Sequence, residues 1–419
     1  MQDNEKKPAL RFKGFTDPWE QRKLGEIAVF SKGVGYSKND LCEEGTPIIL
    51  YGRLYTKYET CIFDVDTFVK EKAGSVYSKG GEVIVPASGE TAEDISIASV
   101  VVKPGILLGG DLNIVSPTAE YDSAFLALTI SSGATHKYLS SLAQGKSVVH
   151  LHNADIQSVS AKFPTKREQE KIHLLFGKID TLITLHQRKY EKLVNIKKSM
   201  LDKMFPQNGV SVPEIRFKGF TDPWEQRKLA ELTKTITTGK SVNSDEGEVS
   251  DGDIGVLKTS CVSYDRFNSS ESKPVVKSEQ QLVKCAVEKD SVIVSRMNTP
   301  ERVGACGYVS TDFPNLFLPD RLWKLKFQDT VDTYFVYMML VSSAYKEKIT
   351  SMASGTSGSM YNIPKETFLN LQLVIPAKID EQKQLGKILK KIDTLITLHQ
   401  RKLEKLQNIK KSCLEKMFV

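Results

Sequence analysis

An internal repeat limits what this chain can fold into more than any other feature of the sequence. The fourteen residues 11–24, RFKGFTDPWEQRKL, recur unchanged at 216–229. The twelve residues 178–189, KIDTLITLHQRK, recur unchanged at 391–402, and the fifteen residues 191–205 match 404–418 at twelve positions. The chain of 419 residues is therefore two copies of one unit of roughly two hundred residues.

The two copies share their ends and differ almost completely in their middles, residues 25–164 and 230–375. The shared ends are thus expected to perform one task twice, whereas each middle performs a task of its own. Two copies in one chain can also pack about a pseudo-twofold axis, because each closing segment meets a near-copy of itself. Gene duplication followed by drift is the plainer explanation, but it does not account for ends that stayed the same.

Each copy closes with a segment that predicts a long helix. Apolar residues recur there at alternating steps of three and four, the spacing of a coiled-coil seam, and the face is expected to continue through Ile196 and Ile409. A lone amphipathic helix is marginal in water, so we expect the two to pair, antiparallel if a twofold axis relates them. We interpret the two matched histidines as packed seam residues rather than metal ligands. The predicted pairing residues are Ile179, Ile183, His186, Leu193, Ile392, Ile396, His399 and Leu406.

Charge is distributed unevenly between these helices and the rest of the chain. Residues 166–205 carry ten basic and five acidic side chains, and residues 378–418 carry eleven and five. The two helical segments together have a net charge of +11. Because the whole chain has a net charge of +7, the rest of it has a net charge of −4. This balance permits nucleic acid as a partner without requiring it.

The two middles read as short strands broken by Gly, Pro, Asn and Asp, which is typical of compact α+β domains. Helices are predicted at 123–131 and 333–351. Strands are predicted at 47–51, 81–86, 97–102, 290–295 and 322–327. The predicted fold class is therefore α+β, with two pseudo-symmetric domains separated by two long antiparallel coiled-coil helices.

Polar loops of the middles supply candidate DNA-binding residues, since Arg bridges guanine edges, Asn bridges adenine edges, and Ser, Thr and Lys hold phosphates. Each middle also ends in a polar stretch that closes on an asparagine, at 145–153 and 355–362. The same residue types populate ordinary turns, which is the competing interpretation. The candidates are Tyr51, Arg53, Tyr55, Ser88, Thr91, Lys146, Ser147, His152 and Asn153 in the first middle, and Lys240, Arg296, Asn298, Thr299, Arg302, Arg321, Ser357, Tyr361 and Asn362 in the second.

Signatures of catalysis and of metal binding are missing from the sequence. Gly-Lys-Ser occurs at 145–147 and 239–241, but a phosphate-binding loop needs a glycine five positions earlier, where Ser140 and Lys234 stand. The six cysteines are widely spaced without a Cys-x-x-Cys pair, which fits a reducing compartment. No apolar run approaches the roughly 18 residues of a membrane span. We therefore predict a cytoplasmic binding and scaffolding protein that uses no metal or cofactor of its own.

The duplicated Trp-Glu-x-Arg-Lys-Leu motif at 19–24 and 224–229, with two variable middles each followed by a long helix, resembles the specificity subunits of type I restriction-modification systems. The stretches 47–56, 81–91 and 295–304 resemble patterns of that family too. The resemblance covers nearly the whole chain. It implies a first target recognition domain at 1–165, a helix for spacing and partner docking at 166–205, a second recognition domain at 206–376, and a distal pairing helix at 377–419.

The resemblance further implies that the chain reads a bipartite asymmetric target on double-stranded DNA in a system of defence against foreign DNA, without catalysis of its own. Two methyltransferase subunits would dock on it and carry the restriction subunits. The assembled complex would be an adenine-N6 DNA methyltransferase and an ATP-dependent site-specific endonuclease, whose partner subunits use S-adenosylmethionine, ATP and Mg²⁺. Two alternatives remain open: a coiled-coil adaptor whose domains bind proteins or other ligands, and a solitary enzyme with an unrecognised site.

Overall fold

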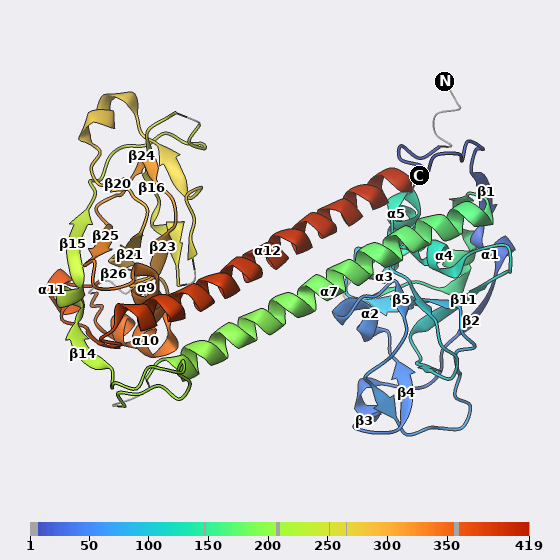
Figure 1. Cartoon of the computed structure of the whole chain (residues 1–419). Helices are drawn as coiled ribbons and strands as arrows, with labels where there is room; N and C mark the ends of the chain where they lie inside the picture. The colour runs from blue at the N-terminus through green and yellow to red at the C-terminus, as the bar shows by residue number, and fades with distance from the viewer. Residues whose placement is uncertain are drawn as a thin grey trace. The chain divides into compact units, whose positions relative to one another are not determined.

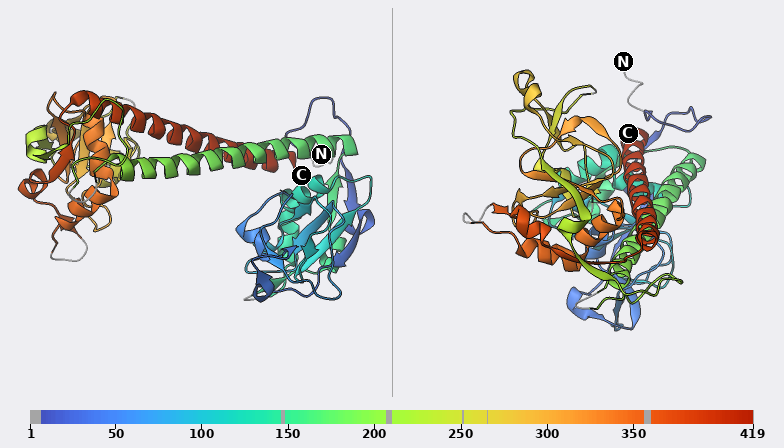
Figure 2. Two further views of the ribbon diagram at one scale, coloured as in Figure 1. Left: turned by 60° about the horizontal axis from the view of Figure 1, so that its bottom comes forward. Right: turned by 60° about the vertical axis from the view of Figure 1, so that its left-hand side comes forward.

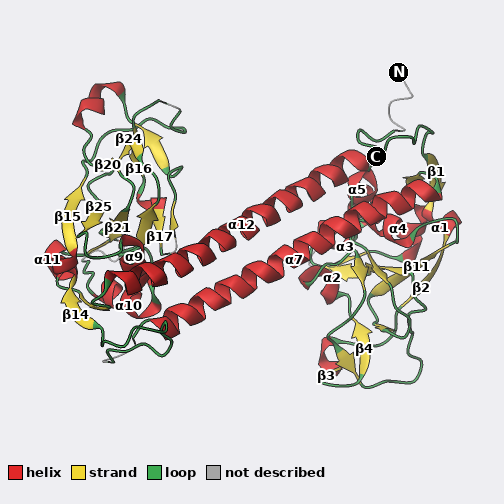
Figure 3. Ribbon diagram, in the orientation of Figure 1, coloured by secondary structure: helices red, strands yellow, loops and turns green. Residues whose placement is uncertain are grey.

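The computed structural model describes residues 7–145, 148–206, 210–250, 252–264, 266–355 and 360–418. It divides into two compact units, residues 1–188 with 400–419, and residues 189–399. Each unit contains one domain of strands and short helices together with part of both long helices, α7 (Lys166–Met204) and α12 (Ile379–Met417). Helices and strands are interspersed within each domain (Figure 3), and the predicted α+β class with two long helices is confirmed.

The first domain is built on a five-stranded sheet and a four-stranded sheet. The five-stranded sheet has the order β2 (Ala28–Lys32), β11 (Leu112–Pro117), β7 (Glu82–Pro86), β9 (Ser99–Val101), β5 (Cys61–Ile62), with only the last pair parallel. The four-stranded sheet has the order β10 (Leu107–Leu108), β4 (Thr46–Ile49), β6 (Phe68–Val69), β3 (Leu41–Cys42). Two short pairs complete it, β1 (Glu20–Lys23) with β13 (Ser160–Phe163), and β8 (Ser88–Gly89) with β12 (Val149–His150).

The second domain repeats this plan. Its main sheet has the order β15 (Thr233–Thr238), β25 (Leu322–Phe327), β21 (Ser291–Ser295), β23 (Cys306–Val309), and its other sheet β19 (Ser272–Pro274), β16 (Gly255–Leu257), β24 (Phe313–Phe317), β20 (Ala286–Val287). The short pairs are β14 (Glu225–Lys228) with β27 (Gln372–Ile375), β22 (Met297–Asn298) with β26 (Tyr361–Asn362), and β17 (Val262–Ser263) with β18 (Arg266–Phe267). The first four strands of each main sheet correspond one to one, although their sequences do not.

Short helices cover these sheets. In the first domain they are α1 (Leu24–Ile27), α2 (Gly52–Thr56), α3 (Ala92–Ile95), α4 (Ser123–Ile130), α5 (Gly133–Leu142) and α6 (Asn153–Ser158). In the second they are α8 (Leu229–Leu232), α9 (Thr333–Val341), α10 (Ser343–Ser351) and α11 (Lys365–Leu369). Two sequence predictions needed correction. The helix predicted at 333–351 is broken at Ser342, and the segment after the strand predicted at 47–51 is not a loop, since Tyr51 caps α2.

The core of each domain includes the end of the long helix that closes the other copy. Met417 and Phe418 lie in the core of the first domain, where the Phe418 ring stacks on Phe125 with centroids 5.4 Å apart. Met204 and Phe205 occupy the matching place in the second domain, with the Phe205 ring 5.5 Å from Phe335. Burying one such side chain is worth about 1.5–3 kcal/mol. Each domain is therefore complete only with a helix end from the other copy.

The two long helices run antiparallel inside each unit. In the first unit Asp180 of α7 pairs with Lys410 of α12 at 2.6 Å, and the rings of Phe176 and Phe418 are 6.0 Å apart. Figures 1 and 2 show the end of α12 (red) alongside the first part of α7 (green) in this unit, and Figure 1 shows α5 next to the end of α12. In the second unit Lys197 of α7 pairs with Asp393 of α12 at 2.7 Å.

The eight predicted pairing residues are all buried or half-buried, and Ile179 and Ile392 are the most buried of them. The expected continuation of the seam was wrong at one matched position in each helix. Ile196 and Ile409 remain 38% and 40% exposed, and the neighbouring Lys197 and Lys410 face the partner helix through their ion pairs. A charged pair thus replaces an apolar contact at the same place in both copies.

Candidate nucleic-acid interface

The shared opening motif holds each domain to the start of its own long helix. Arg11 donates from Nε and Nη2 to the carboxylate of Glu168 at 2.7 and 2.8 Å, and Arg216 makes the same two bonds to Glu381. Both carboxylates are almost fully buried. The Trp224 Nε1–H also donates to Glu381, at 3.2 Å.

Each following glutamine fastens the helix start to the domain as well. The side chain of Gln169 accepts from the backbone N–H of Asp122, and Gln382 accepts from that of Asp332, both at 2.9 Å. Sequence reasoning missed these framework residues. The signal was present, because Arg11 and Arg216 recur in the motif and Glu-Gln recurs at the start of both helices.

In the second domain, the strand pair β22–β26 brings together two loops that sequence reasoning had singled out separately. Met297 pairs with Asn362, and Asn298 with Tyr361. Arg296 precedes this pair, and its Nε donates to the Asp320 carbonyl oxygen at 2.8 Å, while its Nη1 lies 3.5 Å from Oδ1 of Asn362. The planar guanidinium group of an arginine has five N–H donors. These two contacts orient the group and use only two of its donors.

Asp320 joins this site to the end of β15. The Ser241 hydroxyl donates to its carboxylate at 2.5 Å, and the Thr238 hydroxyl donates to its carbonyl oxygen at 3.0 Å. Lys240 and Arg321, the neighbours in sequence of Ser241 and Asp320, are both exposed. We name Lys240, Arg296, Arg321 and Asn362 the second-domain cluster. Three cations beside the ends of adjoining strands, and one amide on β26, form a surface suited to phosphates and base edges.

The remaining second-domain candidates lie close to this cluster in sequence but play local roles. Asn298 is buried, and its amide donates to the Ser295 hydroxyl at 3.0 Å. Thr299 is exposed and accepts backbone bonds from Arg302 and Val303 in a tight turn. Arg302 is exposed and Tyr361 is half-buried. Ser357 lies outside the described residues.

In the first domain, the pair β8–β12 occupies the place of β22–β26, and its side chains are different. Ser88 pairs with His150, whose Nδ1 lies 3.2 Å from the serine hydroxyl. The Tyr55 hydroxyl donates to the Ser88 carbonyl oxygen at 2.6 Å, and burial raises the tyrosine pKa. The exposed rings of His150 and His152 stack nearly parallel with centroids 6.5 Å apart. We name Ser88, His150, His152 and Asn153 the first-domain cluster.

Asn153 joins this cluster to β2, and two further first-domain candidates, Thr91 and Tyr51, lie near it. Asn153 begins α6 and donates from its amide to the Ser31 carbonyl oxygen at 2.9 Å, at the end of β2. Thr91 caps α3 by accepting from the backbone N–H of Asp94. Tyr51 is 37% exposed, with its ring 6.0 Å from that of Tyr55. Lys146 and Ser147 lie outside the described residues.

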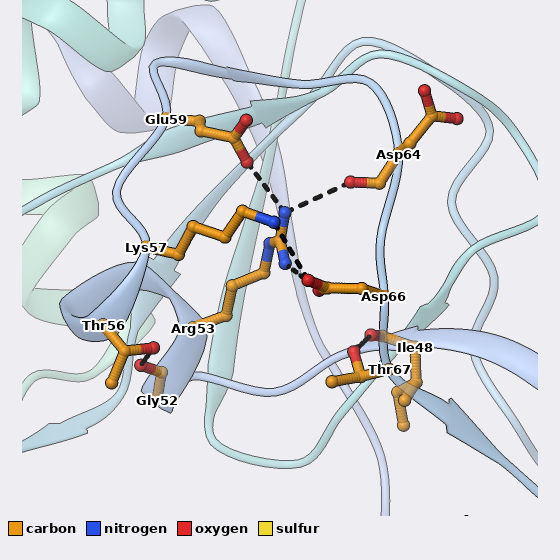
Figure 4. A network of polar contacts seen from close by, with 9 residues as sticks. All are labelled: Ile48, Gly52, Arg53, Thr56, Lys57, Glu59, Asp64, Asp66 and Thr67. Atoms are coloured by element: carbon orange, nitrogen blue, oxygen red, sulfur yellow. Dashed lines mark hydrogen bonds and ion pairs between the residues drawn. The ribbon is translucent and has the colours of Figure 1, made fainter. Parts of the chain in front are cut away.

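Arg53 is already used inside the domain. Its guanidinium donates to Asp66 and to Glu59, each at 2.7 Å, and to the Asp64 carbonyl oxygen at 3.1 Å (Figure 4). Its side chain is 7% exposed, and Lys57 also pairs with Asp66. The structure therefore gives Arg53 a structural role, holding the loop of residues 59–66 around α2, in place of the open guanidinium that a base contact requires.

The backbone bonds of the two strand pairs fix which residues correspond. The N–H of Leu151 donates to Ala87 and the N–H of Ile363 donates to Arg296, so Ala87 stands where the second domain has Arg296. The N–H of Ala87 donates to the Asp111 carbonyl oxygen, and the N–H of Arg296 donates to the Arg321 carbonyl oxygen. Asp111 of the first domain therefore corresponds to Arg321 of the second.

By the same register, His150 stands where the second domain has Asn362. The two asparagines that close the polar stretches, Asn153 and Asn362, are therefore not equivalent. Both polar stretches end in an asparagine, but the strand register does not place these two asparagines at matched positions.

The described residues contain no group of three or more His, Cys, Asp or Glu side chains placed to hold a metal ion. In the same part of the chain, no helix is both long and apolar enough to span a bilayer.

Comparison with known proteins shows which protein family this chain belongs to. The family of type I restriction modification DNA specificity domains matches residues 16–195 and again residues 221–408. The specificity subunit of the type I restriction enzyme MjaVIII of Methanocaldococcus jannaschii is 22% identical over 404 residues, covering 94% of this chain and 91% of that protein. The EcoEI specificity subunit of Escherichia coli is 23% identical over 200 residues, covering 47% of this chain and 34% of that protein.

A solved structure supports the same fold. The crystal structure of the type I restriction-modification S subunit from M. genitalium covers 99% of both chains, with a TM-score of 0.64 at 14% identity. The chain thus belongs to the family of type I restriction-modification DNA specificity domains. It is the specificity subunit of such a system, and these comparisons favour this function over a coiled-coil adaptor for proteins or other ligands.

Proposed function

We propose that each domain reads one half of a split, asymmetric DNA sequence. The observation that carries the proposal is the correspondence of the two clusters: one strand framework presents Arg296, Arg321 and Asn362 in the second domain, and Ala87, Asp111 and His150 in the first. A shared frame with different side chains is what two readers of different base sequences require. Arg321 and Asp111 are exposed in both domains and opposite in charge, a difference that support of the fold does not explain.

The chemistry of the clusters indicates what each half contains. Arginine forks match the O6 and N7 acceptors of guanine, and asparagine amides match adenine. The second-domain cluster therefore suits a half-site with guanine at the position that faces Arg296. The first-domain cluster offers imidazole, hydroxyl and amide groups and lacks arginine at the matched places. Its half-site is accordingly read with fewer charged contacts.

The long helices have two tasks in this proposal. Each contains 39 residues, or about 58 Å of helix at a rise of about 1.5 Å per residue, so their length sets the number of base pairs between the half-sites. They also dock two methyltransferase subunits, which carry the restriction subunits. In the assembled complex those partners perform adenine-N6 methylation with S-adenosylmethionine, and DNA cleavage with ATP and Mg²⁺. This chain supplies recognition and placement, and it binds no cofactor.

The test is to express the chain with its methyltransferase subunit in a host that lacks other adenine methylation, and to sequence the methylated bases. We expect one bipartite sequence with two unlike halves and a fixed gap, methylated once in each half. A single continuous site, or a site with identical halves, would contradict the proposal. Exchanging Arg296 for alanine should relax one half only, which ties the reading to the cluster rather than to the chain as a whole.

A further inference from the structure

The fourteen residues shared by the two copies include more than the framework needs. Five of them are buried or half-buried in both copies, and core packing together with the pairs Arg11–Glu168 and Arg216–Glu381 accounts for this match. The other nine are exposed in both copies. Some of these nine form the turn, where Gly14 and Gly219 have positive φ angles of 94° and 99° that glycine adopts without strain.

Core packing gives the strand that ends the motif no reason to be identical in the two copies. All four side chains of β1 are exposed, and the same is true of β14. Their partner strands β13 and β27 alternate between buried and exposed residues, as a half-buried strand does. Exposed strand positions tolerate substitution, because their side chains contribute little to the core. Nevertheless Glu-Gln-Arg-Lys is unchanged, whereas the sequences diverge directly after Leu24 and Leu229.

We propose that the exposed faces of β1 and β14 are two copies of one docking surface for the methyltransferase subunit, one subunit per copy. This inference rests on the proposed function for the identity of the partner. An unlike partner at each end would select unlike side chains, as the two DNA-facing clusters show. Identical side chains in both copies point to an identical partner bound twice.

The chemistry of the surface fits a protein rather than DNA. It mixes charges, with Glu20 and Arg22 in an ion pair at 2.8 Å beside Gln21 and Lys23. A surface for phosphates would be uniformly basic, whereas a polar rim of mixed charge is typical of transient or assembled protein interfaces. In the first copy, Gln21 also lines a surface pocket together with Tyr138 of α5 and Ser160 of β13, so the face is recessed rather than flat.

The position of the surface suits a subunit that must also touch the helices. Through Arg11 the motif is bonded to the first turn of α7, and the N–H of Leu10 donates to the Lys416 carbonyl oxygen near the end of α12 at 2.9 Å. In the second copy, Ile215 makes the same bond to Lys203 near the end of α7. A partner bound to β1 or β14 therefore also contacts the long helices where they join the domain, and it does so in both copies.

The experiment uses the full chain and purified methyltransferase subunit without DNA. One variant combines Gln21→Glu with Lys23→Glu, a second combines Gln226→Glu with Lys228→Glu, and a third combines all four changes. The control, Gln281→Glu with Lys284→Glu, makes the same charge change at exposed positions of the second domain that have no counterpart in the repeat. Native mass spectrometry counts the bound subunits, and a fluorescence titration gives the affinity.

We expect two bound subunits for the control, one for each single-copy variant, and at least a tenfold weaker complex for the variant altered in both copies. Two subunits bound with unchanged affinity to the latter would overturn the proposal. Because no DNA target is involved, failure here leaves the reading of two half-sites standing.

A second measurement does not depend on the stability of the variants. A photoreactive benzoylphenylalanine placed at position 21 or at position 226 should crosslink to the methyltransferase subunit on illumination, and the same group at position 281 should not. Equal crosslinking from all three positions, or none from the first two, would contradict the assignment.

Discussion

The two domains of this chain are alike where the sequence looks unrelated and unlike where DNA recognition needs them to differ. Asp122 and Asp332 both cap a fully buried helix, accepting from the N–H of Phe125 and Phe335 at 2.8 Å. On the same frame, Arg296 stands where the first domain has Ala87, and Arg321 where it has Asp111. The comparison teaches that each middle combines a matched framework, set by backbone bonds, with side chains at and beside β8–β12 and β22–β26 that differ between the two domains.

The largest effect on stability should come from removing a framework ion pair that both copies share. Removing one partner of a buried ion pair typically costs about 3–5 kcal/mol, because the other charge remains buried and unpaired. Glu168→Ala and Glu381→Ala should therefore each lower the free energy of unfolding by roughly that amount. Denaturant unfolding measures it. Unequal losses, with one variant nearly as stable as the unaltered chain, would break the claim that the motif does the same work in both copies.

Replacing Arg296 should affect one half-site alone. A bidentate arginine contact to a guanine contributes about 1–3 kcal/mol of discrimination. Arg296→Ala should thus weaken binding of the complete target about 10- to 100-fold and relax the second half-site, leaving the first unchanged. The exposed Lys284→Ala serves as a control for lost charge. Competition binding against targets altered in either half measures this effect, and an equal loss at both halves would contradict the division of labour.

Two helical glycines should respond to the same substitution in opposite directions. A Cβ at Gly386 would lie 2.7 Å from the carboxylate of Asp332, whereas a Cβ at Gly177 would have no atom within 4 Å. Gly386→Ala should therefore disturb the helix cap of Asp332 and cost about 1–2 kcal/mol. Gly177→Ala should stabilise the chain by up to about 1 kcal/mol through helix propensity. Thermal unfolding of both variants checks the pair, and a shift in the same direction would contradict the geometry.

The smallest effect concerns a pair present in one domain only. His173 Nδ1 lies 2.8 Å from Asp122, which raises the pKa of the histidine, and the corresponding position of α12 is Gly386. Burial raises the pKa of both Asp122 and Asp332, but hydrogen bonds from His173 and from the helix backbone bring the pKa of Asp122 below its ordinary value, whereas that of Asp332 stays raised. The raised histidine pKa stabilises the fold below about pH 6.5 and this contribution fades as the pH rises through the folded value.

At the acidic end the contribution of Asp122 is lost as the pH falls through its lowered value, so the pair is strongest between about pH 4 and 6.5. His173→Gln should therefore cost up to about 1 kcal/mol at pH 6 and almost nothing at pH 8.5. Unfolding at the two pH values gives the difference. An equal cost at both would show that the imidazole acts by packing and not by charge.

Periodicity and repetition predicted the large features of this molecule. The seam spacing gave both long helices, and the strand predicted at 322–327 coincides with β25, because its residues pack on the sheet in a local pattern. The framework pair Arg11–Glu168 joins residues 157 positions apart, so no local pattern reveals it. Ser342 breaks a helix for which the apolar run gave no warning.

Candidate loops were harder to judge, because side-chain roles depend on contacts that residue type does not specify. Arg53 and Arg296 belong to similar polar stretches, yet one is held by the carboxylates of Glu59 and Asp66 and the other is oriented beside Asn362. The asparagines at 153 and 362 end similar stretches but differ in strand register. The sequence named the right segments but treated them as loops, and it could not rank the side chains on them.

The most direct test of one domain for one half-site is to give a single chain the same reader twice. Residues 25–164 would be replaced by residues 230–375 of the same chain, which the matched order of the main sheets allows. Methylated bases would then be sequenced in cells that also express the methyltransferase subunit. The account predicts an inverted repeat of the original second half-site with the first half-site gone. Persistence of the original asymmetric sequence would contradict it.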